Sequence, residues 1–187
     1  MSDDATGFVG SIPENYDRGL GPIIFTDYDE HTARLVAGYA PSRVLETGAG
    51  TGIVTRRLRD LLPPRTRLIA TDLNLPMLDV ARKKFRPDEP VEFHHADAMA
   101  LPFSHASFDV VVCQFSVMFF PEKDKSYREA YRVLAPGVAM YSASGTAATT
   151  GMPASLTKSP PNFSRPIRRN SIGSGRATTK STRSRTR

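Results

Sequence analysis

Residues 44–52 have the sequence VLETGAGTG, in which a short apolar run leads through an acidic residue into three closely spaced glycines. This pattern predicts a β-strand, a tight turn and the start of a helix, an arrangement that often binds a nucleotide cofactor. Glycine adopts backbone angles that a Cβ forbids, so Gly48 and Gly50 would let a ligand approach the main chain closely. The alternative is a strand-to-helix turn that binds no ligand.

The glycine spacing and the charge beside the loop indicate the class of cofactor. A dinucleotide pyrophosphate loop has the spacing Gly-x-Gly-x-x-Gly, whereas this loop has Gly-x-Gly-x-Gly. Glu46 brings a carboxylate to the loop, which would repel a pyrophosphate and attract a ligand that carries an ammonium group and a sulfonium. S-adenosylmethionine carries both cations, so we expect it to be the cofactor.

Three further apolar runs predict three more strands, each with a polar residue near its end. They are LIATD, which ends at Asp72, VEFHHAD, which ends at Asp97, and FDVVVCQF, which contains Gln114. The last run is the most continuously apolar segment of the chain, which is typical of a central strand buried on both faces. An acidic residue at the end of the second strand is placed to accept hydrogen bonds from ribose hydroxyls.

Helix signals lie between these strands. Asn74 is expected to cap a helix that extends to Phe85, and a second helix is predicted from about Asp124 to Leu134, stopped by residues 135–137. Strands that alternate with helices predict an α/β fold, a Rossmann-like parallel sheet with helices on both faces. In such sheets ligands bind at the carboxyl ends of the strands, where all of the polar residues named above lie.

The order and spacing of these motifs resemble a class I S-adenosylmethionine-dependent methyltransferase of the ubiquinone/menaquinone-biosynthesis type. The segments that carry the resemblance are VLETGAGTG at 44–52, IATDLNLPMLDVARKKF at 69–85 and HADAMALPFSHASFDVVVCQFSVMFFPEKDKSYREAYRVLAPG at 95–137. The resemblance as a whole covers roughly residues 8–137. The resemblance implies a methyltransferase that acts on a small-molecule acceptor. It also implies no protein nucleophile, because alignment of an activated methyl group supplies most of the catalysis.

By the same resemblance, fourteen residues would bind the cofactor. They are Glu46, Thr47, Gly48, Ala49, Gly50, Thr51, Gly52, Asp72, Leu73, Met77, Asp97, Ala98, Met99 and Gln114. Glu46 and the glycine loop would hold the methionine part, and Asp72 would hold the ribose. Leu73 and Met77 would pack near the adenine, whose amino edge Asp97 and Ala98 would contact. Gln114 would lie beside the sulfonium.

Residues 1–43 resemble an arm and helix that fold over the cofactor and help to build the acceptor pocket. Tyr16 and Tyr28 are candidates for lining that pocket, and ordinary packing of an N-terminal helix is the alternative for each. Four basic residues gather near the end of the helix that Asn74 begins: Arg82, Lys83, Lys84 and Arg86. They are expected to form a solvated helix end, with a nucleic-acid patch as the alternative.

The composition limits the cellular setting. Cys113 is the only cysteine and lies in the most apolar strand, so we expect no disulfide and a reducing cytoplasm. The sequence has no apolar run of about 18 residues and no charged-then-apolar leader, so neither a membrane span nor a secretory signal is expected. His94 and His95 are adjacent on a strand and would point to opposite faces, so they cannot share a metal ion and no metal is expected.

Charge divides the chain into two unlike parts. Residues 1–137 hold all 19 acidic residues and 16 of the 25 Lys and Arg, a net charge of −3, whereas residues 138–187 carry +9 and no acid. We therefore expect an S-adenosylmethionine-binding core at 44–137 and a basic, disordered tail at 138–187, within which residues 138–141 can form one short strand. The usual last strands of a seven-stranded methyltransferase sheet would then be missing, and we hypothesise a reading-frame shift near codon 137 or 138.

The basic tail also suggests an alternative function, that of a nucleic-acid-binding protein. After Tyr141 its only aromatic residue is Phe163, which argues against specific binding of single strands. Non-specific, salt-sensitive attraction to nucleic acid is expected from the charge alone.

Overall fold

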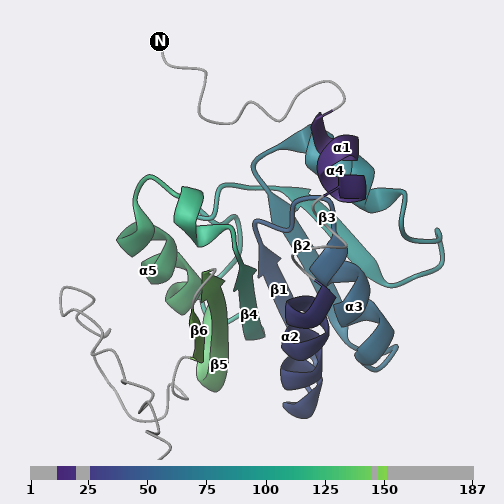
Figure 1. Ribbon diagram of the computed structural model, residues 1–187. Helices are drawn as coiled ribbons and strands as arrows, with labels where there is room; N and C mark the ends of the chain where they lie inside the picture. Colours follow the sequence, from purple (N-terminus) through teal and green to yellow (C-terminus); the bar gives the residue numbers. More distant parts are fainter. Residues whose placement is uncertain (1–11, 20–25, 145–146, 151–187) are drawn as a thin grey trace, which may run out of the picture.

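The computed structural model describes residues 12–19, 26–144 and 147–150 of the 187-residue chain. These residues form a sheet of six strands in the order β3-β2-β1-β4-β5-β6 (Figure 1). The strands are β1 (Arg43–Thr47), β2 (Arg67–Asp72), β3 (Val91–His95), β4 (Phe108–Gln114), β5 (Leu134–Ser144) and β6 (Ala147–Thr150). Strands β1 to β5 are parallel, and β6 pairs with β5 in the antiparallel direction. The Rossmann-like parallel sheet is therefore confirmed.

Helices cover both faces of this sheet. They are α1 (Ile12–Gly19), α2 (Thr26–Gly38), α3 (Ile53–Leu61), α4 (Leu75–Arg82) and α5 (Lys123–Val133), together with a 3-10 helix, η2 (Val117–Phe119). Figure 1 shows α2 beside α3 on one face and α5 on the other. None of the helices in the described part of the chain is long and apolar enough to cross a membrane.

Two hydrophobic cores lie on opposite sides of the sheet because successive side chains of a strand alternate between its faces. Val44 of β1 packs in the core under α2 and α3, whereas its neighbour Leu45 packs in the core under α5. Val111 and Val112 of β4 divide in the same way, and both are fully buried. Strand β4 is therefore buried on both faces, as its unbroken apolar sequence predicted.

The strand order reverses between β1 and β4. From β1 the chain moves outward to β2 and β3, then returns to the other side of β1 to form β4. Loops at the carboxyl ends of β1 and β4 therefore leave in opposite directions, which opens a crevice at this edge of the sheet. The parallel register places Glu46 of β1 opposite Val112 of β4 and Ala70 of β2, so the carboxyl ends of all three strands lie at the same level.

The sheet continues further along the chain than the sequence predicted. Strand β5 pairs with β4 from Ala139 to Ala143, and β6 adds an antiparallel strand that was not expected. The predicted boundary at residue 138 therefore falls inside β5, which extends beyond the short strand expected at residues 138–141. Residues 151–187, which contain all nine basic residues of the predicted tail, lie outside the described residues. The predicted disorder and the nucleic-acid alternative both depend on this segment.

Helix α5 has the bounds that the sequence predicted to within one residue, but the segment after it differs from the prediction, and α4 is shorter than predicted. Helix α5 ends at Val133 and leads directly into β5, and residues 135–137 lie where the register of β5 on β4 shifts. Pro136 and Gly137 thus occupy an irregularity within the strand, where both residue types are tolerated. Helix α4 is capped by the Asn74 side chain as predicted, but ends at Arg82.

Candidate cofactor site

The loop after β1 has a backbone that only glycine adopts easily. Gly48, Gly50 and Gly52 have φ angles of 65°, 56° and 77°, in the left-handed region. A Cβ on Gly48 would overlap Ser116 Cβ, and a Cβ on Gly52 would lie 2.8 Å from Ala81 Cβ. Two of the glycines are therefore required for close packing as well as for φ. The Ser116 hydroxyl donates to the Gly48 carbonyl at 2.5 Å and joins this loop to the segment after β4.

A cavity of about 280 Å³ opens between this loop and the carboxyl ends of β2, β3 and β4. Twelve of the fourteen predicted cofactor residues line it: Glu46, Gly48, Ala49, Gly50, Thr51, Asp72, Leu73, Met77, Asp97, Ala98, Met99 and Gln114. Thr47 and Gly52 do not. The Thr47 hydroxyl instead donates to the Val112 carbonyl at 3.4 Å, within the sheet. Gly52 permits the close packing of α3 on α4 described above.

Asp72 connects the two loops that form the floor of this cavity. Its Oδ2 accepts the Gly50 N–H at 2.8 Å, and its Oδ1 accepts the Asn74 N–H at 2.8 Å. Burial raises the pKa of the carboxyl above its ordinary value, and the backbone hydrogen bonds oppose that shift. A carboxylate oxygen has room for more than one hydrogen bond, so each oxygen keeps capacity for a donor from a ligand.

Glu46 is a second acid at the cavity, and it is almost fully buried at the end of β1. Burial raises its pKa to about 8; the nearby Asp72 carboxylate adds to the shift, whereas the hydrogen bond from Thr55 opposes it. That bond joins Thr55 Oγ1 to Glu46 Oε2 at 2.6 Å. A cation beside a buried carboxyl stabilises its charged form and offsets the cost of burial, so this position favours a cationic ligand.

The third acid is Asp97, just after β3. Its Oδ1 accepts the Met99 N–H at 2.8 Å, which orders the turn that follows the strand. The described residues that line the cavity thus include three acids, Glu46, Asp72 and Asp97, but no Lys, Arg or His. This charge distribution favours a ligand that carries positive charge.

Two buried polar atoms at the cavity have no partner. Among the described residues, only Thr51 Oγ1 and Gln114 Nε2 are buried side-chain atoms without a hydrogen bond, and both residues line this cavity. Leaving such an atom unsatisfied costs roughly 1–3 kcal/mol. A ligand that supplies hydrogen-bond partners here would recover that free energy, so the polar atoms present fit a ligand rich in oxygen and nitrogen.

Comparison with known proteins agrees with this geometry. Residues 44–137, half of the chain, match the methyltransferase domain family. The chain belongs to this family. The match begins at Val44, at the start of the glycine-rich segment, and agrees with the family that the sequence resemblance predicted.

Individual relatives give the same result. The methyltransferase-family chain is 40% identical over 106 residues to a demethylmenaquinone methyltransferase of Clavibacter sepedonicus. This alignment covers 57% of this chain and 42% of the relative. It is 37% identical over 101 residues to the ubiquinone/menaquinone biosynthesis C-methyltransferase UbiE of Hahella chejuensis, which covers 52% of this chain and 41% of the relative. The chain thus spans less than half the length of these two relatives.

Solved structures support the fold. A Methanococcus maripaludis protein described as an S-adenosyl-L-methionine-dependent methyltransferase superposes with a TM-score of 0.67 at 20% identity, covering 77% of this chain and 67% of that one. At this level of identity the similarity shows the fold alone.

One wall of the cavity in this methyltransferase domain was not predicted from the sequence. Residues 115–121, which follow β4, contribute Phe115, Ser116, Phe119, Phe120 and Pro121 to the lining. The remaining unpredicted lining residues are Ile53, Val54, Asn74 and Ala96. The sequence FSVMFFP contains the signal, because so many aromatic residues directly after a strand that ends at the ligand edge are placed to line it. We call residues 115–121 the aromatic wall.

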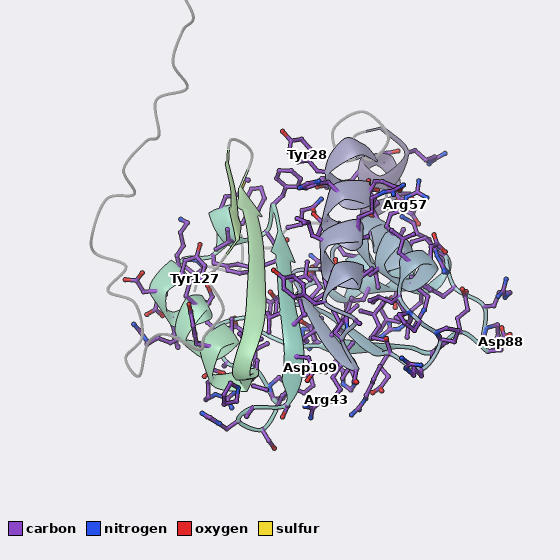
Figure 2. The ribbon with its side chains drawn as sticks, turned by 90° about the horizontal axis from the view of Figure 1, so that it is seen from below. Tyr28, Arg43, Arg57, Asp88, Asp109 and Tyr127 are labelled. Atoms are coloured by element: carbon purple, nitrogen blue, oxygen red, sulfur yellow. The ribbon has the colours of Figure 1, made fainter. Side chains whose placement is uncertain are left out.

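The two candidate tyrosines lie in different places. Tyr16 of α1 lines the cavity, and burial raises its pKa. Tyr28, at the start of α2 (Figure 2), is not a lining residue. It packs edge-to-face on Phe115 with 5.4 Å between ring centroids. Phe115 has a φ of 59°, which is uncommon for a residue with a Cβ and is typical of a backbone held by its surroundings.

The basic cluster at the end of α4 is paired with acids rather than free. Lys84 forms an ion pair with Asp17 and Lys83 with Glu14, both on α1, which lies against α4 (Figure 1). Arg82 and Arg86 pair with acids on or near their own helix. The cluster therefore helps to place α1, and with it Tyr16, beside the cavity.

Proposed function

We propose that this chain binds S-adenosylmethionine in the cavity and transfers its methyl group to a small-molecule acceptor. The observation that carries the proposal is the combination, in one cavity, of a glycine-rich loop with three acids and no basic side chain among the described lining residues. The sulfonium and ammonium groups of S-adenosylmethionine match that charge. The methyltransferase activities for which the relatives are named support the same conclusion.

Each acid has a distinct role in this proposal. The Asp72 carboxylate, held by two backbone N–H groups, would accept both ribose hydroxyls. Glu46 would lie close to the cationic methionine part. Asp97 and Ala98 would contact the adenine amino edge, while Leu73 and Met77 pack on the ring.

When bound, S-adenosylmethionine supplies a methyl group on a sulfonium, whose carbon–sulfur bond breaks with the electron pair left on sulfur. The chain therefore needs no nucleophile of its own and acts by holding the acceptor in line with that bond. The aromatic wall offers flat apolar surfaces for this purpose, and it carries no charged side chain. An acceptor with an electron-rich ring, such as the hydroquinone form of the demethylmenaquinone for which a relative is named, fits both features.

Isothermal titration of S-adenosylmethionine into the full-length protein tests the proposal. One molecule is expected to bind per chain, and methyl transfer to reduced demethylmenaquinone is expected in a radiolabelled assay. A folded protein that binds no S-adenosylmethionine would contradict the proposal, whereas binding without transfer to this acceptor would contradict only the choice of acceptor.

The affinity for S-adenosylmethionine is expected to rise with pH and to level off near pH 8. Glu46 has a pKa of about 8 in the ligand-free protein, and a bound cation lowers that pKa because it favours the carboxylate. Binding below pH 8 then releases a proton, so affinity increases by up to about tenfold per pH unit. Titrations between about pH 6 and 8 measure this dependence. A Glu46→Gln variant, which cannot ionise, should lack the dependence; an unchanged slope in that variant would assign the proton to another group.

Removal of residues 151–187 is expected to leave the affinity for S-adenosylmethionine unchanged. All the described lining residues precede this segment, which carries nine basic residues and no acid. The remaining chain has a net charge of −3, so retention on an immobilised polyanion at low salt should disappear. The cut falls after Thr150, because an earlier one would remove β6 from the sheet. A truncated protein that stays folded but loses cofactor binding would show that the segment is part of the site.

A further inference from the structure

Gln114 reaches the cavity with one end of its amide held and the other end free. Its Oε1 accepts a hydrogen bond from the Thr32 hydroxyl of α2, whereas its Nε2 is buried and has no partner. The Gln114 side chain lines the cavity although the residue is only 7% exposed, and Thr32 is fully buried. The bond joins residues 82 positions apart in the sequence.

In this structure Thr32 bonds to the oxygen of the Gln114 amide, and this orientation leaves the nitrogen end for a ligand. A glutamine amide has an acceptor oxygen at one end and a donor NH₂ at the other, so fixing the oxygen against α2 leaves the NH₂ group for the cavity. An NH₂ group donates only, and its partial positive charge disfavours contact with a sulfonium or an ammonium. Its partner in a complex is therefore an acceptor atom. Since the adenine nitrogens are proposed to lie beside Leu73 and Asp97, on the β2 and β3 side of the cavity, the acceptor near the end of β4 is an oxygen.

Helix α2 supports the end of β4 at a second point. Tyr28 lies four residues before Thr32, so the two side chains share one side of the helix. Tyr28 packs on Phe115, the residue next to Gln114. The same helical surface thus holds the Phe115 ring and the Gln114 amide, which restricts the movement of both.

We propose that Thr32 is a positioning residue, which orients the Gln114 amide so that its NH₂ group donates a hydrogen bond to an oxygen of the bound ligand. This inference rests on the proposed function, because the ligands concerned are S-adenosylmethionine and its methyl acceptor. The oxygen belongs either to the carboxylate of the methionine part or to a hydroxyl or carbonyl group of the acceptor. The recognition chemistry is the same in both cases.

Three variants of the full-length protein and a control test the proposal. Thr32→Val removes the hydroxyl at nearly constant shape, and Thr32→Ser restores a hydroxyl. Gln114→Met replaces the amide by an unbranched apolar side chain of similar length that has no N–H donor. Thr66→Val is the matched control. The Thr66 side chain is as buried as that of Thr32, and its hydroxyl donates to the Pro41 carbonyl at 2.8 Å. Thr66 directly precedes β2, so it lies at the end of the strands opposite the cavity.

Three ligands distinguish the two sources of the oxygen. S-adenosylmethionine carries the carboxylate, 5′-methylthioadenosine lacks the whole amino-acid part, and reduced demethylmenaquinone is titrated with S-adenosylhomocysteine present. If the oxygen is the carboxylate, Thr32→Val weakens S-adenosylmethionine binding about tenfold and leaves methylthioadenosine binding unchanged. If it belongs to the acceptor, only the binding of the hydroquinone is weakened, by a similar factor. In either case Thr32→Ser binds like wild type, Gln114→Met is weakened at least as much as Thr32→Val, and Thr66→Val binds like wild type.

Several results would overturn the inference. One is a Thr32→Val protein that binds all three ligands like wild type. Another is a Thr32→Ser protein impaired as much as Thr32→Val, which would show that packing rather than the hydroxyl matters. Full affinity of Gln114→Met would show that the cavity needs no donor at this position. A wild-type protein that does not bind S-adenosylmethionine would instead refute the proposed function on which the inference rests.

Discussion

A Gly48→Ala variant is expected to bind S-adenosylmethionine about 100-fold more weakly than wild type, a loss composed of backbone strain and steric overlap. At a φ of 65° the new Cβ adds strain of about 1–2 kcal/mol. The same Cβ would overlap Ser116 Cβ, so the aromatic wall must move away from the glycine loop. Movement there widens the cavity on the side where the acceptor is proposed to lie. Isothermal titration measures the loss of affinity.

A second substitution separates the overlap from the strain. Ser116→Gly in the Gly48→Ala background removes the Ser116 side chain, so it should recover affinity in proportion to the overlap. Gly50→Ala provides a comparison in ligand-free stability, because φ is similar but its Cβ would lie 3.7 Å from the nearest atom, Met77 Cε. Gly48→Ala should therefore lower the free energy of unfolding more than Gly50→Ala. Equal losses of unfolding free energy in the two variants would show that Ser116 moves away from the new Cβ without a loss of stability.

Much of the site was predictable because parallel strands bring their carboxyl ends to one edge. Apolar periodicity was enough to place β1, β2 and β4, and each acid that follows an apolar run then had to lie beside the same crevice. The unbroken run from Val110 to Cys113 likewise predicted burial on both faces, and all four residues are buried. Patterns of this kind involve residues that are neighbours in the sequence, so they can be recognised in a single sequence.

The features that were missed depend on contacts between distant residues or on the backbone alone. The Thr32 bond to Gln114 joins α2 to β4, and no local pattern indicates it. The turn at Phe115 has a positive φ without the Gly or Asn that usually signals one. Strand β6 has the sequence AATT, with no apolar alternation, and it is held to β5 by the antiparallel ladder. Backbone pairing leaves little trace in side-chain patterns, so the end of the sheet was placed too early.

An Asp72→Ala variant is expected to bind S-adenosylmethionine more weakly by roughly 2–4 kcal/mol, because it removes two charge-assisted hydrogen bonds to the ribose. The substitution also removes the acceptors of the Gly50 and Asn74 N–H groups, so it should lower stability as well. Titration of the ligand and chemical unfolding of the free protein measure the two effects separately.

Asp109→Ala is the matched control for the structural part of this loss. Asp109 also accepts two backbone N–H groups, those of Ser42 and Arg43 at 2.8 and 2.9 Å, and forms an ion pair with the Arg43 side chain. It lies near the start of β4, at the end of the sheet opposite the cavity, where Figure 2 shows it beside Arg43. Both variants should lose stability, but only Asp72→Ala should lose affinity. A comparable loss of affinity in Asp109→Ala would attribute the effect to general destabilisation.

The ribose assignment is tested by changing the ligand together with the residue. Wild type should bind a 2′-deoxy analogue of S-adenosylmethionine more weakly than the natural ligand, because one hydroxyl donor to Asp72 is missing. Asp72→Ala should bind the two ligands with similar affinity, since the acceptor of that hydroxyl is gone. The difference between the two comparisons is the coupling free energy between the carboxylate and the hydroxyl, expected at about 1.5–3 kcal/mol for a hydrogen bond to a charged group. A coupling free energy near zero would show that the ribose does not bind to Asp72. The role of Asp72 would then be to join the two loops through the Gly50 and Asn74 N–H groups.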